Sequence, residues 1–410
     1  MQKRAFWFGI LLSVVISLLW WIPSAAAFTE EQDLISQAWR IVNQTYLDET
    51  FNHQNWWFVR QKYLKQSLSK REDTYMAIEE MLASLDEPFT RLLRPQEYRS
   101  LQVSTSGELS GVGLQIDLNP ETKELEVVAP IAGSPAEQAG VKARDRILQI
   151  DDVNTTNLSL EEAASRMRGP KGTTVTLTVK AKGDSLPRSI KIVRDRISLN
   201  PVYATLDRKT SNIPIGYIRL SQFSANAMPE LASSIAKLDR QGAKAYVLDL
   251  RNNPGGLLQA GIEIARLWLD KGAIVYTVNR QGMLGSFDAV GNALTKAPLV
   301  VLVNEGTASA SEILAGALQD NGRAMLVGQK TFGKGLIQSL FELTDGSGLA
   351  VTVAKYETPN HRDIHKSGIV PDVVVSQDGI TLKEIGSEVD QQYQTAVKLL
   401  TSKTVLADAS

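Results

Sequence analysis

The sequence predicts a multidomain α/β protein, because three parts of its 410 residues follow different hydrophobic patterns. Apolar residues recur at steps of three and four over residues 28–103, which is typical of packed helices. Over residues 104–197 the period changes to two, which indicates a small β-rich module. From residue 198 to residue 379, apolar strands alternate with helical stretches, and this alternation is typical of βα units on a buried, largely parallel sheet.

The overall composition argues against some classes of protein. Lys and Arg total 44 and Asp and Glu total 45, so a net charge of −1 argues against a polycation that binds nucleic acid. The chain has no cysteine, which excludes a disulfide, a thiolate nucleophile and a Cys-ligated metal. We therefore expect a globular protein that does not bind nucleic acid.

Residues 1–27 have the pattern of an export signal. Lys3 and Arg4 precede an apolar stretch over residues 5–22, and small residues then lead to a cleavage site after Ala27. An uncleaved membrane anchor is the alternative, because the apolar stretch approaches membrane-spanning length. With a cleaved signal or with an anchor, the protein is exported from the ATP-rich cytosol. This disfavours a nucleotide-dependent function.

Two helical segments flank the rest of the chain. Residues 28–103 are predicted to form an N-terminal domain, and Trp56, Trp57 and Phe58 are expected in its core because aromatic clusters at helical spacing usually pack. Residues 380–410 return to helical periodicity and are predicted as a C-terminal helical segment.

The β-rich module, residues 104–197, resembles a PDZ domain. It contains a predicted helix that starts at Ser159 with a capping box, and a glycine-containing loop lies where a PDZ domain binds a carboxylate. The N–H groups of Val112, Gly113 and Leu114 in this loop can hold a peptide carboxylate while the peptide adds as a strand.

The segment that follows contains a serine and a lysine that could form a nucleophile and its base. Ser309 begins a helix after the apolar strand 299–303, and unpaired N–H groups at a helix start favour an alkoxide or a developing oxyanion. Lys334 lies in a glycine-rich loop, and the chain has only 3 His as other candidate bases. The plainer alternatives are that Ser309 or Ser311 caps the helix and that Lys334 lies on the surface. The pairing makes a Ser/Lys hydrolase the leading hypothesis.

A lysine base must release its proton near neutral pH. Its pKa must fall from ~10.4 to near 7, a change of about 4 kcal/mol, so Lys334 needs an apolar site. Apolar residues on both sides of the loop are suitable. Gln338 lies four residues further on in a predicted strand, so we expect it on the same face as Lys334, where its amide orients the amine.

The turn after the strand 245–250 is a candidate oxyanion hole. It contains Gly255 and Gly256, and either backbone N–H can act with that of Ala310, just after the nucleophile. An ordinary strand-to-helix turn is the alternative. Asp320 ends the Ser309 helix, where an acid opposes the helix dipole, and a structural salt bridge is its plainer explanation.

Two other motifs point to different chemistry but are incomplete. Residues 328–334 match most of a phosphate-binding loop, but Gly335 replaces the required Ser or Thr and a β pattern follows. His361 and His365 have the spacing of a two-histidine metal site, but the helix and the glutamate are missing. We therefore expect no nucleotide, no metal and no other cofactor.

Taken together, residues 253–256, 306–312 and 331–335, after a PDZ-like module, resemble the C-terminal processing peptidases. These are tail-specific Ser/Lys proteases with a crotonase-like core. The resemblance implies that Ser309 is the nucleophile, Lys334 the base and Gln338 its orienter. It also implies functional importance for two further residues. One is Asp320, as a further acid, and the other is Arg168, at a position linked in relatives to PDZ-controlled activation. An exposed arginine at a helix end is the alternative for Arg168.

Residues 28–32 and 38–40 are further similar to the cyanobacterial and plastid branch of this family, which trims the photosystem II reaction-centre precursor in the thylakoid lumen. This resemblance implies an exported enzyme of the lumen or periplasm that binds substrate C-terminal tails. It implies membrane contact only through the substrate or an uncleaved signal. The alternative is a PDZ-containing scaffold or chaperone without proteolytic activity.

Overall fold

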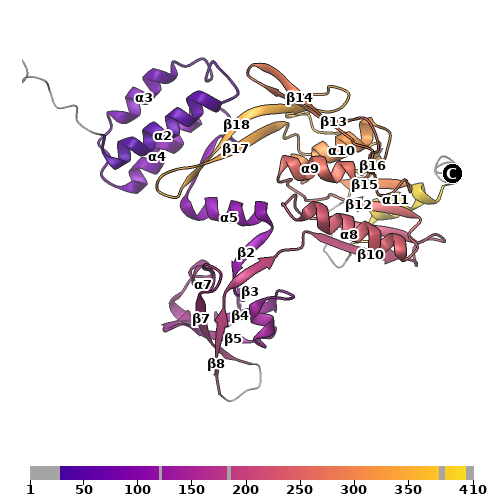
Figure 1. Ribbon diagram of the computed structural model, residues 1–410, viewed down its shortest axis with the longest axis horizontal. Coiled ribbons are helices and arrows are strands. Elements are labelled where there is room, and N and C mark those ends of the chain that lie inside the picture. Colours follow the sequence, from indigo (N-terminus) through magenta and orange to yellow (C-terminus); the bar gives the residue numbers. More distant parts are fainter. Residues whose placement is uncertain (1–27, 120–121, 182–185, 378–383, 403–410) are drawn as a thin grey trace, which may run out of the picture. The chain divides into compact units, whose positions relative to one another are not determined.

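The computed structural model describes residues 28–119, 122–181, 186–377 and 384–402 (Figure 1). They divide into two compact units. The first contains residues 28–96 and Gln338–Val353, and the second contains Glu97–Ile337 and residues 354–402. No helix within these described ranges is both long and apolar enough to cross a membrane. The predicted signal, residues 1–27, lies outside them.

The first unit is a helical domain with a β-hairpin arm. Its elements are α2 (Glu30–Thr45), α3 (Trp56–Leu64), α4 (Arg71–Ala83), β1 (Arg91–Leu93) and parts of β17 (Leu336–Glu342) and β18 (Gly348–Glu357). β1 pairs antiparallel with β18, and Leu349 and Val351 of β18 join the helices in one hydrophobic core. The prediction of an N-terminal domain over residues 28–103 therefore did not include the arm, because the strands of the arm come from a distant part of the sequence.

The aromatic run in α3 is only partly buried. Trp56 is 3% exposed, but Trp57 is 54% and Phe58 64% exposed, so the prediction of a three-residue aromatic core was wrong. Consecutive helix residues point about 100° apart, so one residue of the run faces the core while its neighbours turn away.

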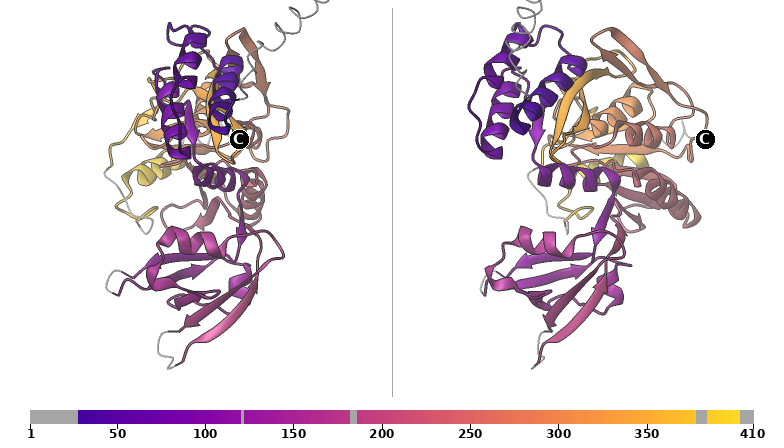
Figure 2. Two further views of the ribbon diagram at one scale, coloured as in Figure 1. Left: turned by 90° about the vertical axis from the view of Figure 1, so that its left-hand side faces the viewer. Right: turned by 60° about the vertical axis from the view of Figure 1, so that its left-hand side comes forward.

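The second unit contains a β module between residues 108 and 198. Its sheet has the order β3-β4-β5-β7-β8, with β6 beside β5. The module is drawn in purple to magenta in Figure 2. The strands are β3 (Leu114–Leu118), β4 (Leu125–Pro130), β5 (Arg146–Ile150), β6 (Val153–Asn154), β7 (Thr174–Lys180) and β8 (Arg188–Val193), and the helices are α6 (Pro135–Gln138) and α7 (Leu160–Met167). The predicted capping box is present, because Ser159 and Glu162 bond reciprocally at the start of α7. A ribbon of β2 (Glu108–Gly111) and β9 (Asp195–Ser198) and the helix α5 (Pro95–Ser106) adjoin the module in sequence.

The rest of the second unit is built on a six-stranded sheet with the order β10-β11-β12-β15-β16-β19. β10 is antiparallel to β11 and the other pairs are parallel, which confirms the predicted βα architecture. The strands are β10 (Val202–Asp207), β11 (Ile215–Leu220), β12 (Ala245–Asp249), β15 (Leu299–Val303), β16 (Met325–Gly328) and β19 (Val373–Val374). β13 (Ala273–Asn279) and β14 (Gly282–Asp288) form a hairpin that pairs with β18.

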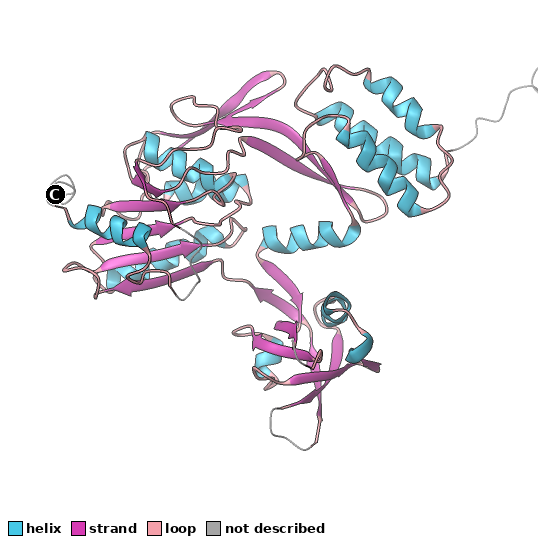
Figure 3. Ribbon diagram, turned by 180° about the vertical axis from the view of Figure 1, so that it is seen from behind, coloured by secondary structure: helices cyan, strands magenta, loops and turns pink. Residues whose placement is uncertain are grey.

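Helices cover both faces of the six-stranded sheet (Figure 3). On one face α8 (Ala227–Arg240), α9 (Leu258–Arg266) and α10 (Ala310–Asp320) share a core with the strands, and α11 (Gln391–Thr401) packs on the other. The predicted C-terminal segment is thus part of this layered core. Because parallel strands end at the same edge of a sheet, the loops after β12, β15 and β16 are expected to converge there.

Candidate active site

The backbone of Ser309 is held in an unusual conformation at the start of α10. Its φ of 57° and ψ of −118° are rarely adopted by a residue with a side chain, and such strain costs about 1–3 kcal/mol and persists only where the surroundings hold it. The Glu312 N–H donates to the Ser309 carbonyl oxygen at 2.8 Å, and Ser309 occupies the N-cap position with Glu312 as its capping-box partner. The Ser311 hydroxyl donates to the Asn253 carbonyl at 3.0 Å. Ser309 is thus the N-cap residue of α10, as the plainer interpretation had it, whereas Ser311 is not.

The buried carboxylate of Glu312 joins Ser309 to the lysine loop. One of its oxygens accepts the N–H of Ser309 at 2.9 Å and that of Lys334 at 2.8 Å. The other accepts the N–H of Gly333 at 2.8 Å and the hydroxyl of Thr331 at 2.5 Å. Glu312 is 0% exposed, and four donors compensate for the burial of its charge. One side chain thus fixes the start of α10 against the backbone of Lys334.

A second side chain makes the same connection from the strand β18. The hydroxyl of Tyr356 lies 3.1 Å from the carbonyl oxygen of Ser309 and 2.8 Å from that of Lys334. Burial raises the pKa of Tyr356 well above its usual value, and the negative charges of Glu312 and Asp363 raise it further. The hydroxyl therefore keeps its proton and remains a donor. The structure brings the predicted serine and lysine residues together through their backbones.

The glycine turn packs directly against the serine. A Cβ atom added to Gly255, whose φ is 95°, would lie 2.9 Å from the Ser309 Cβ and 2.9 Å from the Ala310 nitrogen. The Gly255 N–H donates to Asn253 Oδ1 at 2.9 Å. Within the described ranges, no hydrogen bond uses the N–H of Gly256 or of Ala310. The two predicted glycines therefore differ, and Gly256 is the one whose donor is unused.

The PDZ-like loop has the free donors that a carboxylate needs. The carbonyl of Val112 accepts the N–H of Ala136, and that of Gly113 accepts the N–H of Ile131, both at 2.9 Å. The N–H groups of Val112 and Gly113 donate to no residue in the described part of the chain. A Cβ on Gly113 would lie 2.3 Å from the Ser134 Cβ, so only glycine fits. Leu114 starts β3, the edge strand beside which a peptide can add.

The chain is similar to known proteins over most of its length. Residues 214–375 match peptidase family S41, and residues 126–180 match the PDZ domain. The chain is 65% identical to a carboxyl-terminal-processing protease of Picosynechococcus sp., over 98% of this chain and 96% of the relative. The chain belongs to the S41 carboxyl-terminal-processing protease family.

Other relatives agree with this assignment. A chloroplastic carboxyl-terminal-processing peptidase 2 of Arabidopsis thaliana is 46% identical, over 85% of this chain and 70% of the relative. The solved structure of a photosystem II D1 C-terminal processing protease is similar at 39% identity with a TM-score of 0.56, over 92% of this chain and 99% of that one. The predicted family, fold class and peptidase activity are confirmed. The protease is a serine peptidase with a PDZ domain.

A buried ion network lies directly before the glycine turn of the protease. Arg251 donates to both oxygens of Asp249, at the end of β12, and to both oxygens of Asp390, the N-cap of α11. Arg251 is 6% exposed and both acids are 0% exposed. Burial alone would raise the pKa of Asp390, but its bonds to Arg251 outweigh that and lower it. The C-terminal helix thus holds the strand end that leads to the turn.

Replacing Asp390 by alanine should destabilise the protease by about 3–5 kcal/mol, because it leaves part of the Arg251 charge buried and unpaired. Chemical denaturation measures this, and Glu388→Ala, which removes an exposed acid nearby, should have little effect. Because folding lowers the pKa of Asp390, its stabilisation is present above the ordinary value of 3.8 and is lost as the pH falls through the lower folded value. The variant should therefore lose less stability than the wild type on acidification. Equal denaturation midpoints for wild type and Asp390→Ala would contradict this role.

Two other predicted site residues lie differently from expectation. β17 begins at Leu336, so Lys334 precedes the strand, and the expectation that Gln338 shares a strand face with it was wrong. The Gln338 amide donates to Thr352 Oγ1 at 3.2 Å. Asp320 ends the 11-residue helix α10 and, at 1.5 Å rise per residue, lies about 16 Å from Ser309. It pairs with Arg362, so the salt bridge, which was the plainer explanation, is what the structure shows.

The incomplete motifs form neither of the rival sites. Residues 328–334 lead into the strand β17 and not into the helix that a phosphate loop requires. His361 stacks on Tyr276, with ring centroids 4.2 Å apart. Among the residues that the structure describes, no cluster of His, Asp and Glu has the arrangement to hold a metal ion.

Proposed function

We propose that Ser309 is the nucleophile of the protease and Lys334 its general base. The observation that carries this proposal is that Glu312 and Tyr356 each bind the backbones of both residues. The Ser309 hydroxyl attacks the scissile carbonyl carbon while the Lys334 amine takes its proton. Lys334 then gives the proton to the leaving amine, and water hydrolyses the acyl-enzyme that remains on Ser309.

The strained turn at Ser309 supports an oxyanion hole made by the N–H groups of Gly256 and Ala310. Both donors are unused within the described chain. Gly255, which precedes Gly256, packs against Ser309, which precedes Ala310. Gln338 is proposed, on the family resemblance, to orient the Lys334 amine during turnover. Asp320 is proposed to act only through its structural ion pair.

We further propose that residues 104–197, the PDZ domain, hold the substrate C-terminus and that residues 198–379 form the protease core. The tail carboxylate would bind the N–H groups of Val112, Gly113 and Leu114, with the peptide beside β3. Arg168 follows α7 and pairs with Gly111 at the entrance of this loop, which supports its role in coupling tail binding to activation.

The proposed substrate is the photosystem II reaction-centre precursor, and the proposed location is the thylakoid lumen or the periplasm after export. Relatives that are named as chloroplastic and the solved photosystem II D1 C-terminal processing protease support this assignment. Residues 1–27 have the composition of the signal that export requires.

Mass spectrometry of the precursor after incubation with the protease tests the function. We expect a single C-terminal fragment to be released by the wild type and none by Ser309→Ala, which should still bind the tail. A folded wild-type protein that binds several tails and cleaves none of them would support the scaffold alternative instead.

Amidation of the substrate C-terminus should weaken its binding by about 10- to 100-fold, since a hydrogen bond to a charged group contributes about 1.5–3 kcal/mol. Titration of Ser309→Ala with paired acid and amide peptides measures the ratio. Equal affinity for the two forms would remove the carboxylate loop from substrate recognition.

Arg168→Ala should lower turnover more than tail affinity if Arg168 couples the two. The same titration combined with steady-state kinetics separates the effects. Arg166→Ala is the matched control, because Arg166 is another exposed arginine at the end of α7. Equal losses of turnover and affinity in Arg168→Ala would contradict coupling.

A further inference from the structure

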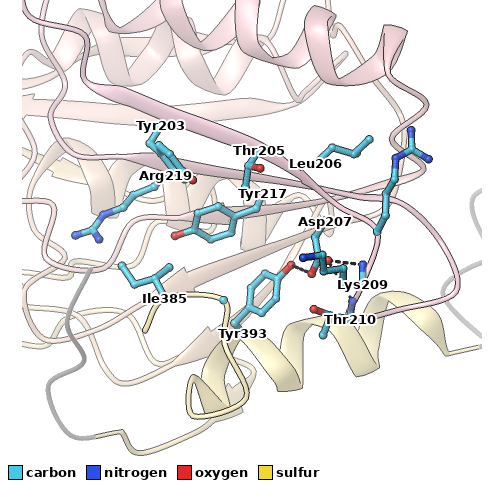
Figure 4. Close-up of a pocket in the computed structure, with 12 residues that line it drawn as sticks. Tyr203, Thr205, Leu206, Asp207, Lys209, Thr210, Tyr217, Arg219, Ile385 and Tyr393 are labelled. Carbon is cyan, nitrogen blue, oxygen red and sulfur yellow. Dashed lines mark hydrogen bonds between the residues drawn. The ribbon is translucent and has the colours of Figure 1, made fainter. Parts of the chain in front are cut away.

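The protease core has a cavity that the proposed catalytic mechanism does not use. Its volume is about 790 Å³, and it lies over β10 and β11 beside the first turn of α11 (Figure 4). Side chains from both strands, from the turn after β10 and from α11 form its walls. Those that bear on its chemistry are Tyr203, Asp207, Lys209, Tyr217, Arg219 and Tyr393.

Aromatic rings form the apolar wall of this cavity. The ring centroids of Tyr217 and Tyr393 are 5.6 Å apart, and those of Tyr203 and Tyr217 are 6.4 Å apart, with the rings edge to face. The hydroxyls of Tyr217 and Tyr393 donate to Asp249 and Asp207, each at 2.7 Å. Tyr217 and Tyr393 are buried and support Tyr203, which is 63% exposed and offers its ring surface to a ligand.

The positive charges around the cavity are less compensated than the negative charge. Asp207 accepts the Tyr393 hydroxyl and the N–H groups of Lys209 and Thr210, so its carboxylate is already bonded. The Nη1 of Arg219 is buried and has no hydrogen-bond partner in the described ranges. Neither Arg219 nor Lys209 forms an ion pair with a described residue. A ligand that complements this wall carries negative charge.

Among the described strands, none pairs with the outer edge of β10, which lies between two hollows. β10 is the terminal strand of its sheet, and a second cavity of about 490 Å³ adjoins it, with Lys237 in its wall. Leu206 and Arg208 line both cavities. Residues 202–206 contain neither a charge nor a proline, the features that commonly prevent an edge strand from pairing.

We propose that the edge of β10 binds an extended acidic segment of a protein partner, which adds to the sheet as a further strand. Main-chain hydrogen bonds to β10 would supply affinity, and successive side chains would point alternately toward the two hollows. An aromatic side chain of the partner packs on the exposed ring of Tyr203, and a carboxylate pairs with Arg219 or Lys209. The segment needs no free C-terminus, which distinguishes this site from the PDZ loop.

Fluorescence anisotropy with blocked peptides tests the proposal. The probe is an acetylated and amidated peptide in which Glu alternates with Phe and Val, added to full-length Ser309→Ala so that it is not cleaved. We expect a peptide with Lys in place of Glu, and the variant Arg219→Glu, each to bind at least tenfold more weakly. Lys209→Glu, on the exposed turn, serves if Arg219→Glu does not fold. Lys65→Glu, an exposed charge reversal in the first unit, should bind as the parent does.

Hydrogen exchange tests the mode of binding. The peptide should slow amide exchange in Val202–Asp207, and N-methylation of alternate peptide amides should abolish binding in one register and not in the other. The proposal fails if the acidic peptide does not bind, if the charge reversals at residues 219 and 209 leave its affinity unchanged, if the Lys peptide binds equally well, or if protection appears elsewhere in the chain.

Discussion

Lys334→Arg should lower kcat/KM by about 10⁴-fold, because a guanidinium stays charged and cannot take the proton of the Ser309 hydroxyl. Arginine keeps the positive charge of the lysine. A loss of this size would therefore come from the missing proton transfer and not from a change of charge. Steady-state cleavage of a tail peptide measures it, and binding of the same peptide to the PDZ loop should remain at the wild-type level.

The loop itself offers a matched control for this substitution. Lys330 is exposed in the same loop, so Lys330→Arg should retain wild-type activity. Lys334→Ala should be as inactive as Lys334→Arg. If Lys334→Arg kept a tenth or more of the wild-type kcat/KM, Lys334 would not be the base.

Glu312→Gln should lower kcat by about 10²- to 10³-fold, because small displacements of reacting groups cost about two orders of magnitude. In the wild type each carboxylate oxygen accepts two donors. The glutamine amide has one oxygen, so whichever way it turns, its NH₂ group meets at least one N–H that cannot accept. The contact between Ser309 and the Lys334 loop is then broken on one side, and each buried unsatisfied group costs about 1–3 kcal/mol of stability.

The kinetic signature separates this effect from general unfolding. In folded Glu312→Gln, kcat should fall while tail affinity at the PDZ loop is unchanged, and Ser309 should react more slowly with an acylating reagent. Glu305→Gln removes an exposed acid just before the same helix and should have no effect. Tyr356→Phe removes the second bridge and should show a smaller loss of kcat. A folded Glu312→Gln enzyme with wild-type kcat would show that the carboxylate does not position the dyad.

The sequence was sufficient for those parts of the site that depend on local patterns. Ser309, Lys334, the glycine turn and the PDZ loop each belong to a short motif with its own backbone requirement, such as the close approach that leaves no space for a Cβ at Gly255 or Gly113. The alternation of strands and helices likewise predicted the parallel sheet, whose central strands β12 and β15 are buried on both faces.

What the sequence did not reveal depends on contacts between distant residues. Glu312 gave a weak signal, as an acid next to the apolar run 313–318, but its partners in the loop after β16 are visible only in the fold. Tyr356 and Asp390 contact residues 22 to 139 positions away. The exposure of Trp57 could not be predicted either, since it depends on which face of α3 meets the neighbouring helices.

The rate at which an active-site phosphonylating reagent modifies Ser309, followed by mass spectrometry as a function of pH, tests whether Lys334 activates Ser309. A neutral Lys334 base predicts that the label appears on Ser309, that its rate rises with pH around a midpoint well below the ~10.4 of free lysine, and that Lys334→Ala removes this rise. An unchanged pH profile in Lys334→Ala, or labelling of a different serine, would contradict the Ser309–Lys334 dyad.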